Sequence, residues 1–168
     1  MTIKTKQWIS KLNLKPHPEG GFYSEAYRSD EILLSTALDG RYAGSRSIST
    51  SIYFLLSGNQ FSAFHKIQSD EIWHFYDGAP INLYLISDDG NLEVKKLGIN
   101  IIENEFPQIT IPKNIWFAAE PTDKENFTLV GCTVAPGFDF DDFELGDRTL
   151  LLRKLPQHKD LILQFTRV

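Results

Sequence analysis

Short apolar runs separated by turn residues fill most of this chain, and this pattern constrains its fold more than any other feature. The pairs Asp39-Gly40 and Gly58-Asn59 are typical of the turns between the runs, because Gly and Asn adopt the positive φ angles that tight hairpins need. Strands do not alternate with long helical segments along the chain. The pattern therefore predicts an all-β sandwich or barrel, and it argues against a parallel α/β fold.

The positions of the elements follow from the spacing of the apolar residues. Strands are expected at residues 21–28, 30–36, 46–56, 61–67, 71–77, 80–87, 91–97, 107–111, 115–120, 127–135 and 138–145. Within 5–13, and again within 157–164, apolar residues recur at helical spacing. The sequence therefore predicts a short helix near each end of an otherwise β-rich chain.

The size and composition of the chain suit one domain over residues 1–168, with a core that needs no disulfide. The expected core consists of Ile52, Phe54, Phe75, Leu83, Leu85, Ile109, Ile111, Leu129 and Val130. The segment 138–147 holds five acidic residues among three phenylalanines. We expect the phenylalanines to insert into the core while the acids face water or a partner.

Charge and cysteine usage exclude several classes of protein. The net charge of −5 argues against a nucleic-acid binder, which needs a basic face. No apolar run reaches the roughly 18–20 residues of a membrane span, and the N-terminus lacks the apolar region of a secretory signal. Cys132 is the single cysteine and is expected to be a buried small hydrophobe. These observations predict a cytoplasmic protein that contacts neither nucleic acid nor membrane.

The segment 58–78 carries the clearest candidate chemistry. Strand alternation and a hairpin turn bring His65 and Glu71 to the same side of the sheet. Such a pair can bind a metal, or the carboxylate can orient the histidine as a general base; a pair that only fills the interior is the alternative interpretation. By the same alternation, His74 faces away from Glu71.

Further polar and aromatic side chains are candidates for contacting a ligand. Tyr23 and Glu25 share a mixed strand face that can hydrogen-bond a polar compound, and Ser51 belongs to a serine row that lines either a cavity or an outer face. Trp73 and Trp116 either pack the core or stack on a ring-shaped ligand. The candidate ligand-binding residues are therefore Tyr23, Glu25, Ser51, Trp73, His74 and Trp116.

The spacing around His65 resembles the first motif of the cupin superfamily, in which two histidines and a glutamate are placed between glycines. His65, Glu71 and Gly78 match its intervals, whereas Ile67 stands where the second histidine is expected. The second cupin motif, P-x-G-x-x-H, is matched only at Pro112, since Phe117 replaces its histidine. Two of the family's three histidine ligands are thus missing.

Longer blocks resemble one subfamily more closely. HPEGGFYSEAYRS, SIYFLL, FHKIQSDEIWHFYDG, PQITIPKNIWFAAE and LVGCTVAPGFDFDDFEL are similar to the uncharacterised cupin family known as cupin_5. The resemblance covers residues 9–152, nearly the whole chain. It implies a cupin-type jelly-roll β-barrel that usually forms a homodimer.

The segment 19–28 is also weakly similar to the opening strand of the nucleotide-sugar 3,5-epimerases. In that family a histidine backed by a carboxylate removes a proton beside a carbonyl group, and a tyrosine returns one. We therefore expect an isomerase or epimerase that binds a polar carbonyl or sugar-type compound and needs no cofactor. The candidate catalytic residues are His65, Glu71, Tyr53 and Tyr76.

Two other functions are consistent with the same residues. The first is a non-catalytic protein that binds or stores a small sugar-like ligand. The second is a metal-dependent cupin enzyme that holds a divalent metal through His65 and Glu71, with His74 as a third ligand if a bulge turns it inward.

Overall fold

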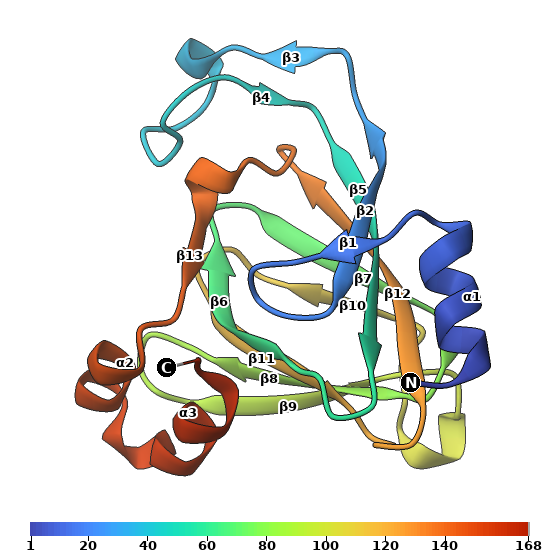
Figure 1. Ribbon diagram of the computed structural model, residues 1–168. Coiled ribbons are helices and arrows are strands. Elements are labelled where there is room, and N and C mark those ends of the chain that lie inside the picture. Colours follow the sequence, from blue (N-terminus) through green and yellow to red (C-terminus); the bar gives the residue numbers. More distant parts are fainter. Residues whose placement is uncertain (168) are drawn as a thin grey trace.

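The strands of the computed structural model, which describes residues 1–167, form two antiparallel sheets that face each other (Figure 1). One sheet has the order β1 (Lys15–Pro16), β2 (Phe22–Arg28), β5 (Thr50–Ser57), β12 (Phe127–Ala135), β7 (Asp70–Gly78) and β10 (Gln108–Ile111). The other has the order β13 (Phe143–Leu145), β6 (Ser62–Ile67), β11 (Trp116–Pro121), β8 (Ile81–Ile86) and β9 (Leu92–Leu97). The predicted β-rich jelly roll is confirmed, although the two sheets are not joined into one closed, hydrogen-bonded barrel.

A small hairpin extends beyond the main sheets. It consists of β3 (Ile32–Leu33) and β4 (Arg46–Ser47), with the short 3-10 helix η1 (Ser35–Ala37) between them (top of Figure 1). The sequence pattern predicted one continuous strand over 46–56. The structure divides it, because β4 pairs with β3 whereas β5 pairs with β2 and β12.

The N-terminal helix α1 (Ile3–Lys11) covers one end of the outer face of the six-stranded sheet. Thr2 caps its first turn by accepting a hydrogen bond from the Thr5 backbone N–H. Apolar side chains of the helix and the turn after it pack against Leu55, Phe127 and Leu129. The predicted helix over 5–13 thus exists and begins two residues earlier.

The C-terminal part holds two short helices where the sequence pattern predicted one. Helix α2 (Arg148–Lys154) begins at the N-cap Asp147, and α3 (Lys159–Phe165) follows the 3-10 helix η4 (Pro156–His158). Two further 3-10 helices are η2 (Ile101–Glu103) and η3 (Phe140–Asp142). Both C-terminal helices pack on the five-stranded sheet, in a cluster with Phe64, Ile86, Trp116 and Ala118. None of the described helices is long and apolar enough to cross a membrane.

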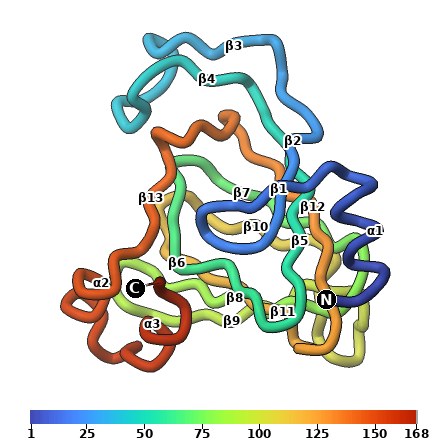
Figure 2. Tube along the Cα trace, in the orientation of Figure 1, coloured from blue at the N-terminus to red at the C-terminus, as the bar shows by residue number. Residues whose placement is uncertain are grey.

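The main core lies between the sheets and includes Phe54, Trp73, Leu83, Phe117 and Val130. Most residues of the expected core are buried there, while Ile52 and Phe75 are only partly buried. Leu129 differs, because it points to the opposite face of β12 and packs beneath α1. The turn between β1 and β2 reaches across to β6 at the open end of this core (Figure 2), and there the sheets enclose a cavity.

Candidate active site

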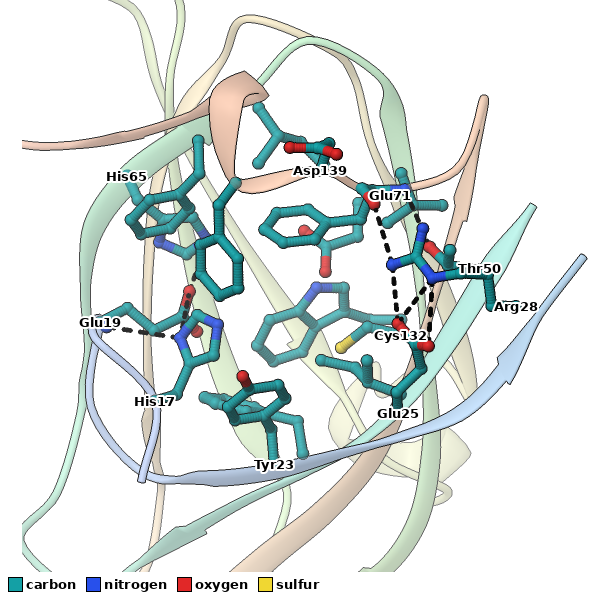
Figure 3. Close-up of a pocket in the computed structure, with 18 of the residues that line it drawn as sticks. His17, Glu19, Tyr23, Glu25, Arg28, Thr50, His65, Glu71, Cys132 and Asp139 are labelled. Atoms are coloured by element: carbon teal, nitrogen blue, oxygen red, sulfur yellow. Dashed lines mark hydrogen bonds and ion pairs between the residues drawn. The ribbon is translucent and has the colours of Figure 1, made fainter. Parts of the chain in front are cut away.

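A cavity of about 370 Å³ lies between the two sheets at this open end (Figure 3). Its volume is within the usual range for small-molecule sites, roughly 300–1,000 Å³. The polar and ionisable side chains in its wall are Lys15, His17, Glu19, Tyr23, Glu25, Arg28, Thr50, His65, Glu71, Trp73, Cys132 and Asp139. Apolar side chains, many of them aromatic, form the rest of the wall.

Glu19 enters the cavity because two glycines let its turn lie flat against the strands. Gly20 and Gly21 have φ angles of 118° and 70°, which favour glycine. A Cβ atom at Gly20 would lie 2.3 Å from the Phe61 carbonyl oxygen, so no other residue fits. The Ala63 backbone N–H donates to the Glu19 carbonyl over 2.9 Å and fixes the turn to β6.

The Glu19 carboxyl meets His65, which projects from β6. Glu19 Oε2 lies 3.1 Å from His65 Nε2, and both side chains are buried. The other carboxyl oxygen accepts a hydrogen bond from the Ser62 hydroxyl over 2.8 Å. His65 Nδ1 lies 2.8 Å from the Ala63 carbonyl oxygen, so this nitrogen carries the proton and Nε2 faces Glu19.

Burial keeps both members of this pair neutral. Desolvation raises the pKa of Glu19 well above its usual value, and the nearby Glu71 raises it further. Desolvation also lowers the pKa of His65 to about 3. Burial therefore favours the form of the pair in which Glu19 carries the proton and donates it to His65 Nε2.

His17 adds a second imidazole beside the pair. Its Nδ1 lies 3.5 Å from Glu19 Oε2, and its ring packs edge-on against Tyr23 with the centroids 4.6 Å apart. Burial lowers the pKa of His17 to about 4. The His17 imidazole is consequently uncharged near pH 7, and its ring nitrogens can form hydrogen bonds.

Glu71 occupies another part of the same cavity wall, near the start of β7. Desolvation raises its pKa to about 7, an effect that the adjacent Trp73 indole and Cys132 thiol partly oppose. Within residues 1–167, neither Glu71 nor Glu19 forms a side-chain ion pair with lysine or arginine. The pattern of alternation predicted a His65–Glu71 pair; both line the cavity, but the carboxyl bound to His65 belongs to Glu19.

The structure divides the other sequence-based candidates between the cavity and the rest of the molecule. Tyr23, Glu25 and Trp73 line the cavity. Ser51, Tyr53, His74 and Tyr76 do not, since they alternate with cavity residues along β5 and β7. Tyr53 and Tyr76 pack on each other with ring centroids 6.1 Å apart, and His74 Nε2 lies 3.2 Å from the Thr133 hydroxyl. Trp116 packs beneath the C-terminal helices.

Sequence reasoning missed several residues of the site. Glu19 belongs to the quoted HPEGG block, whose paired glycines were the available signal for a tight, close-packed turn. Lys15 and Arg28 line the cavity, and Arg28 is paired with Glu25 over 2.7 Å. The buried thiol of Cys132, expected as a small hydrophobe, also lies in the wall.

The phenylalanines of the segment 138–143 lie at the cavity rather than deep in the core. Phe138, Phe140 and Phe143 all contribute to its wall, and the Phe138 carbonyl accepts a hydrogen bond from Arg28. The segment is attached to β4 by a buried Arg46–Asp142 ion pair. It therefore forms an aromatic cover on one side of the cavity.

The donor set does not fit the metal that many cupins hold. Phe117 occupies the position of a motif histidine and packs on the His65 ring with centroids 4.0 Å apart, while Ile67 lines the cavity at the other position. No group of three His, Cys, Asp or Glu side chains in residues 1–167 is arranged to hold a metal ion. A metal site needs three or four such ligands.

Several known proteins share this architecture. Protein SO0799 from Shewanella oneidensis is 40% identical, with a TM-score of 0.87 and 96% of each chain covered. A hypothetical protein from Leishmania major is 31% identical and also has a TM-score of 0.87, with 97% of this chain and 98% of that chain covered. Both comparisons extend over nearly the whole described chain.

A more distant comparison concerns the fold alone. Oxalate decarboxylase from Bacillus subtilis is 11% identical with a TM-score of 0.55, over 94% of this chain and 38% of that chain.

The uncharacterized protein YML079W of Saccharomyces cerevisiae is 29% identical over 146 residues, which are 82% of this chain and 72% of that protein. Residues 6–146 match the family Cupin_5, described as "Cupin superfamily (DUF985)". The resemblance seen in the sequence motifs is thereby confirmed, and the chain belongs to the Cupin_5 family of the cupin superfamily.

Proposed function

We propose that this protein is a small-molecule isomerase that moves a proton next to a carbonyl group, inside the cavity, by acid–base chemistry. One observation carries the proposal: Glu71 and the Glu19–His65 pair, whose burial raises the pKa of both carboxyl groups, lie in the wall of the same cavity. Among residues 1–167, neither carboxyl forms an ion pair with lysine or arginine, so each can change its protonation state. Perturbed carboxyls of this kind are typical of acid–base sites.

Glu71 is the better placed general base. With a pKa of about 7, it is about half ionised at neutral pH, which suits both removal and return of a proton. Its carboxylate takes a proton from the carbon beside the carbonyl, and the electrons of the broken C–H bond form an enolate. Delivery of the Glu19–His65 proton to the same carbon from elsewhere in the wall re-forms the C–H bond and gives the epimer; Glu71 is then protonated and Glu19 ionised until both exchange protons with water. In an α-hydroxy carbonyl compound, return of the Glu71 proton to the former carbonyl carbon, together with transfer of the hydroxyl proton to the former carbonyl oxygen, gives the isomer.

This assignment modifies the roles expected from sequence. Tyr53 and Tyr76 lie outside the cavity, so Tyr23 is the one tyrosine of the three that lines it. Glu71 acts directly rather than by orienting His65, since Glu19 is the group within hydrogen-bonding distance of His65. The substrate class remains a small carbonyl compound.

The test is hydrogen exchange into carbonyl compounds in deuterated water, followed by NMR. Ketoses and cyclic ketones form the panel, and Glu71→Gln and His65→Ala are expected to lower the exchange rate about 100-fold or more. Glu105→Gln is a matched control, because Glu105 is as buried as Glu71 at 7% exposure but pairs with Lys96 outside the cavity. Binding without exchange in the wild type would instead favour the non-catalytic ligand-binding function.

Metal content separates this mechanism from the metal-dependent alternative. The protein, purified without tag or chelator, is expected to contain far less than one equivalent of iron, manganese, nickel or zinc. Near-stoichiometric metal that disappears in His65→Ala would refute the metal-free mechanism. The homodimer and the cytoplasmic location stay predictions, which light scattering and cell fractionation check.

A further inference from the structure

The indole N–H of Trp73 is a buried hydrogen-bond donor that no protein acceptor meets in good geometry. Trp73 is 1% exposed, and Nε1 has no partner in hydrogen-bonding geometry among residues 1–167, although the indole lies close enough to the Glu71 carboxyl to lower its pKa. Leaving such a donor unsatisfied is energetically costly, so native structures contain few buried donors of this kind. Since Trp73 lines the cavity, an acceptor can reach it from there.

The tryptophan ring is held rigidly. It packs edge-on against Phe54 and Phe117, with centroid distances of 5.7 and 6.0 Å. Trp73 and Glu71 occupy alternate positions of β7 and so point to the same side of the sheet. A donor fixed in this way selects the orientation of whatever it binds.

The surroundings indicate what kind of acceptor this is. Ile52, Ile67 and Val134 give the nearby wall an apolar character, so an acceptor carried on an apolar body can enter without losing other hydrogen bonds. The permanent cations of the wall, Lys15 and Arg28, are both exposed, and Arg28 is already paired with Glu25. The more buried ionisable residues, Glu19, Glu71, His17 and His65, offer no permanent positive charge to neutralise an anion. An uncharged carbonyl oxygen fits these conditions better than a carboxylate or phosphate.

We propose that the Trp73 indole N–H binds the carbonyl oxygen of the ligand and thereby places the adjacent carbon at Glu71. The inference rests on the proposed function, because it identifies the substrates of that site as compact, uncharged ketones or aldehydes. Negative charge that develops on the oxygen when the C–H bond breaks is stabilised by the same donor. Trp73 thus determines both which compounds bind and which carbon reacts.

The test compares two probes of the same shape by NMR of protein labelled with ¹⁵N at tryptophan. Cyclohexanone carries the acceptor, and methylenecyclohexane replaces the oxygen by CH₂. The ketone is expected to move the Trp73 indole proton downfield, whereas the hydrocarbon is not. Trp8 and Trp116 are internal controls: Trp8 already donates to Asp77 over 2.8 Å, and Trp116 is buried and unpartnered but lies outside the cavity.

The same two probes can also be compared by measuring their affinities for variants of the two buried tryptophans. In Trp73→Phe, ketone affinity should fall about 3- to 10-fold, the equivalent of one net hydrogen bond, while hydrocarbon affinity does not fall. Trp116→Phe should leave both affinities unchanged. If Trp73→Phe does not fold, the wild-type titration decides, with the Trp73 signal assigned by elimination from Trp8→Phe and Trp116→Phe.

Three results would overturn the inference: equal binding of the two probes, ketone binding without movement of the Trp73 signal, or no binding of either probe. These outcomes are distinct from failure of the proposed function. A ketone that binds through Trp73 but exchanges no hydrogen would refute the isomerase and keep the oxygen site. Hydrogen exchange whose rate is unchanged in Trp73→Phe would refute the oxygen site and keep the isomerase.

Discussion

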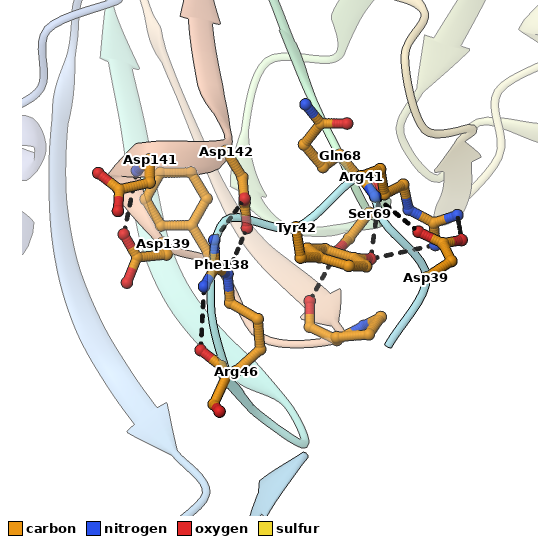
Figure 4. Close-up of polar contacts among 12 residues, drawn as sticks. Asp39, Arg41, Tyr42, Arg46, Gln68, Ser69, Phe138, Asp139, Asp141 and Asp142 are labelled. Carbon is orange, nitrogen blue, oxygen red and sulfur yellow. Dashed lines mark hydrogen bonds and ion pairs between the residues drawn. The ribbon is translucent and has the colours of Figure 1, made fainter. Parts of the chain in front are cut away.

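Two of the buried carboxyl groups among residues 1–167 contact different basic side chains, arginine and histidine, and the basic partner decides what each pair can do. Asp142 meets Arg46 at the junction of β4 with the segment that covers the cavity (Figure 4). Glu19 meets His65 inside the cavity (Figure 3). Burial is similar, at 4% exposure for both side chains of the first pair and 7% and 3% for Glu19 and His65.

The Arg46–Asp142 pair is structural. Arg46 Nη2 and Nε donate to the two carboxylate oxygens over 2.6 and 2.7 Å, which is the bidentate geometry of a strong ion pair. Arginine stays charged under all ordinary conditions, and the hydrogen bonds to Asp142 raise the pKa of Arg46 still further. The ion pair stays formed while the protein is folded and separates only when the protein unfolds.

The Glu19–His65 pair has the opposite character. Histidine can exist without charge, and desolvation makes the neutral carboxyl and neutral imidazole the stable forms. The proton between them is therefore available for transfer. At equal burial, replacing arginine by histidine as the partner converts a fixed ion pair into a proton carrier.

Asp142→Asn tests the structural pair and has the largest expected effect. It removes one charge while keeping the shape, so the Arg46 guanidinium remains buried without a counter-ion. We expect a loss of about 3–5 kcal/mol in the free energy of unfolding, measured by urea denaturation. Asp141→Asn, at the exposed neighbour, should change it by less than about 0.5 kcal/mol. A small loss in Asp142→Asn would show that water reaches Arg46.

Glu71→Gln tests whether burial raises the pKa of this cavity carboxyl. The pKa of Glu71 in the folded protein, about 7, exceeds the ordinary glutamate value of 4.5, so the unfolded chain releases this proton first and wild-type stability falls as pH rises from about 4.5 to 7. Gln cannot ionise. Relative to wild type, the variant should gain stability across that window, reaching about 3 kcal/mol near pH 8. Thermal unfolding at several pH values measures the difference, and a constant difference would contradict the raised pKa.

Glu19→Gln replaces a carboxyl group by an amide in the cavity, just as Asp142→Asn does in the Arg46–Asp142 pair. Its amide can still accept from Ser62 and donate to His65 Nε2, because the native carboxyl is already neutral. We expect a loss below about 1 kcal/mol at about pH 6, whereas Glu19→Ala, which leaves both partners unsatisfied, should cost about 2 kcal/mol. Equal large losses in Glu19→Gln and Asp142→Asn would mean that Glu19 is ionised after all.

Arg28→Ala has the smallest expected effect on stability. Arg28 pairs with Glu25, but their side chains are 42% and 44% exposed, and such pairs contribute about 0–1 kcal/mol. Urea denaturation at low and high salt measures this contribution, which salt should reduce further. A loss as large as that of Asp142→Asn would show that bidentate geometry matters more than burial.

Much of the fold and part of the site could be predicted from the sequence. Alternation within β7 placed Glu71 and Trp73 on one face and His74 on the other, because neighbouring residues of a strand always point to opposite sides. The family motifs identified the cupin jelly roll. Helix α2, the first of the two C-terminal helices, was not predicted, since a helix this short depends on packing against the sheet more than on its own pattern.

Most of the long strands and the faces that their residues share could be read from near neighbours and turn residues, but the predicted strands 46–56 and 138–145 are each interrupted in the structure. Which side chains meet depends on the three-dimensional packing of distant segments. Arg46 and Asp142 are 96 residues apart, and Glu19 reaches His65 through a glycine turn that docks on another strand. The protonation of Glu19, Glu71 and His65 was likewise undetermined by residue type, because it arises from burial among side chains that distant segments bring together.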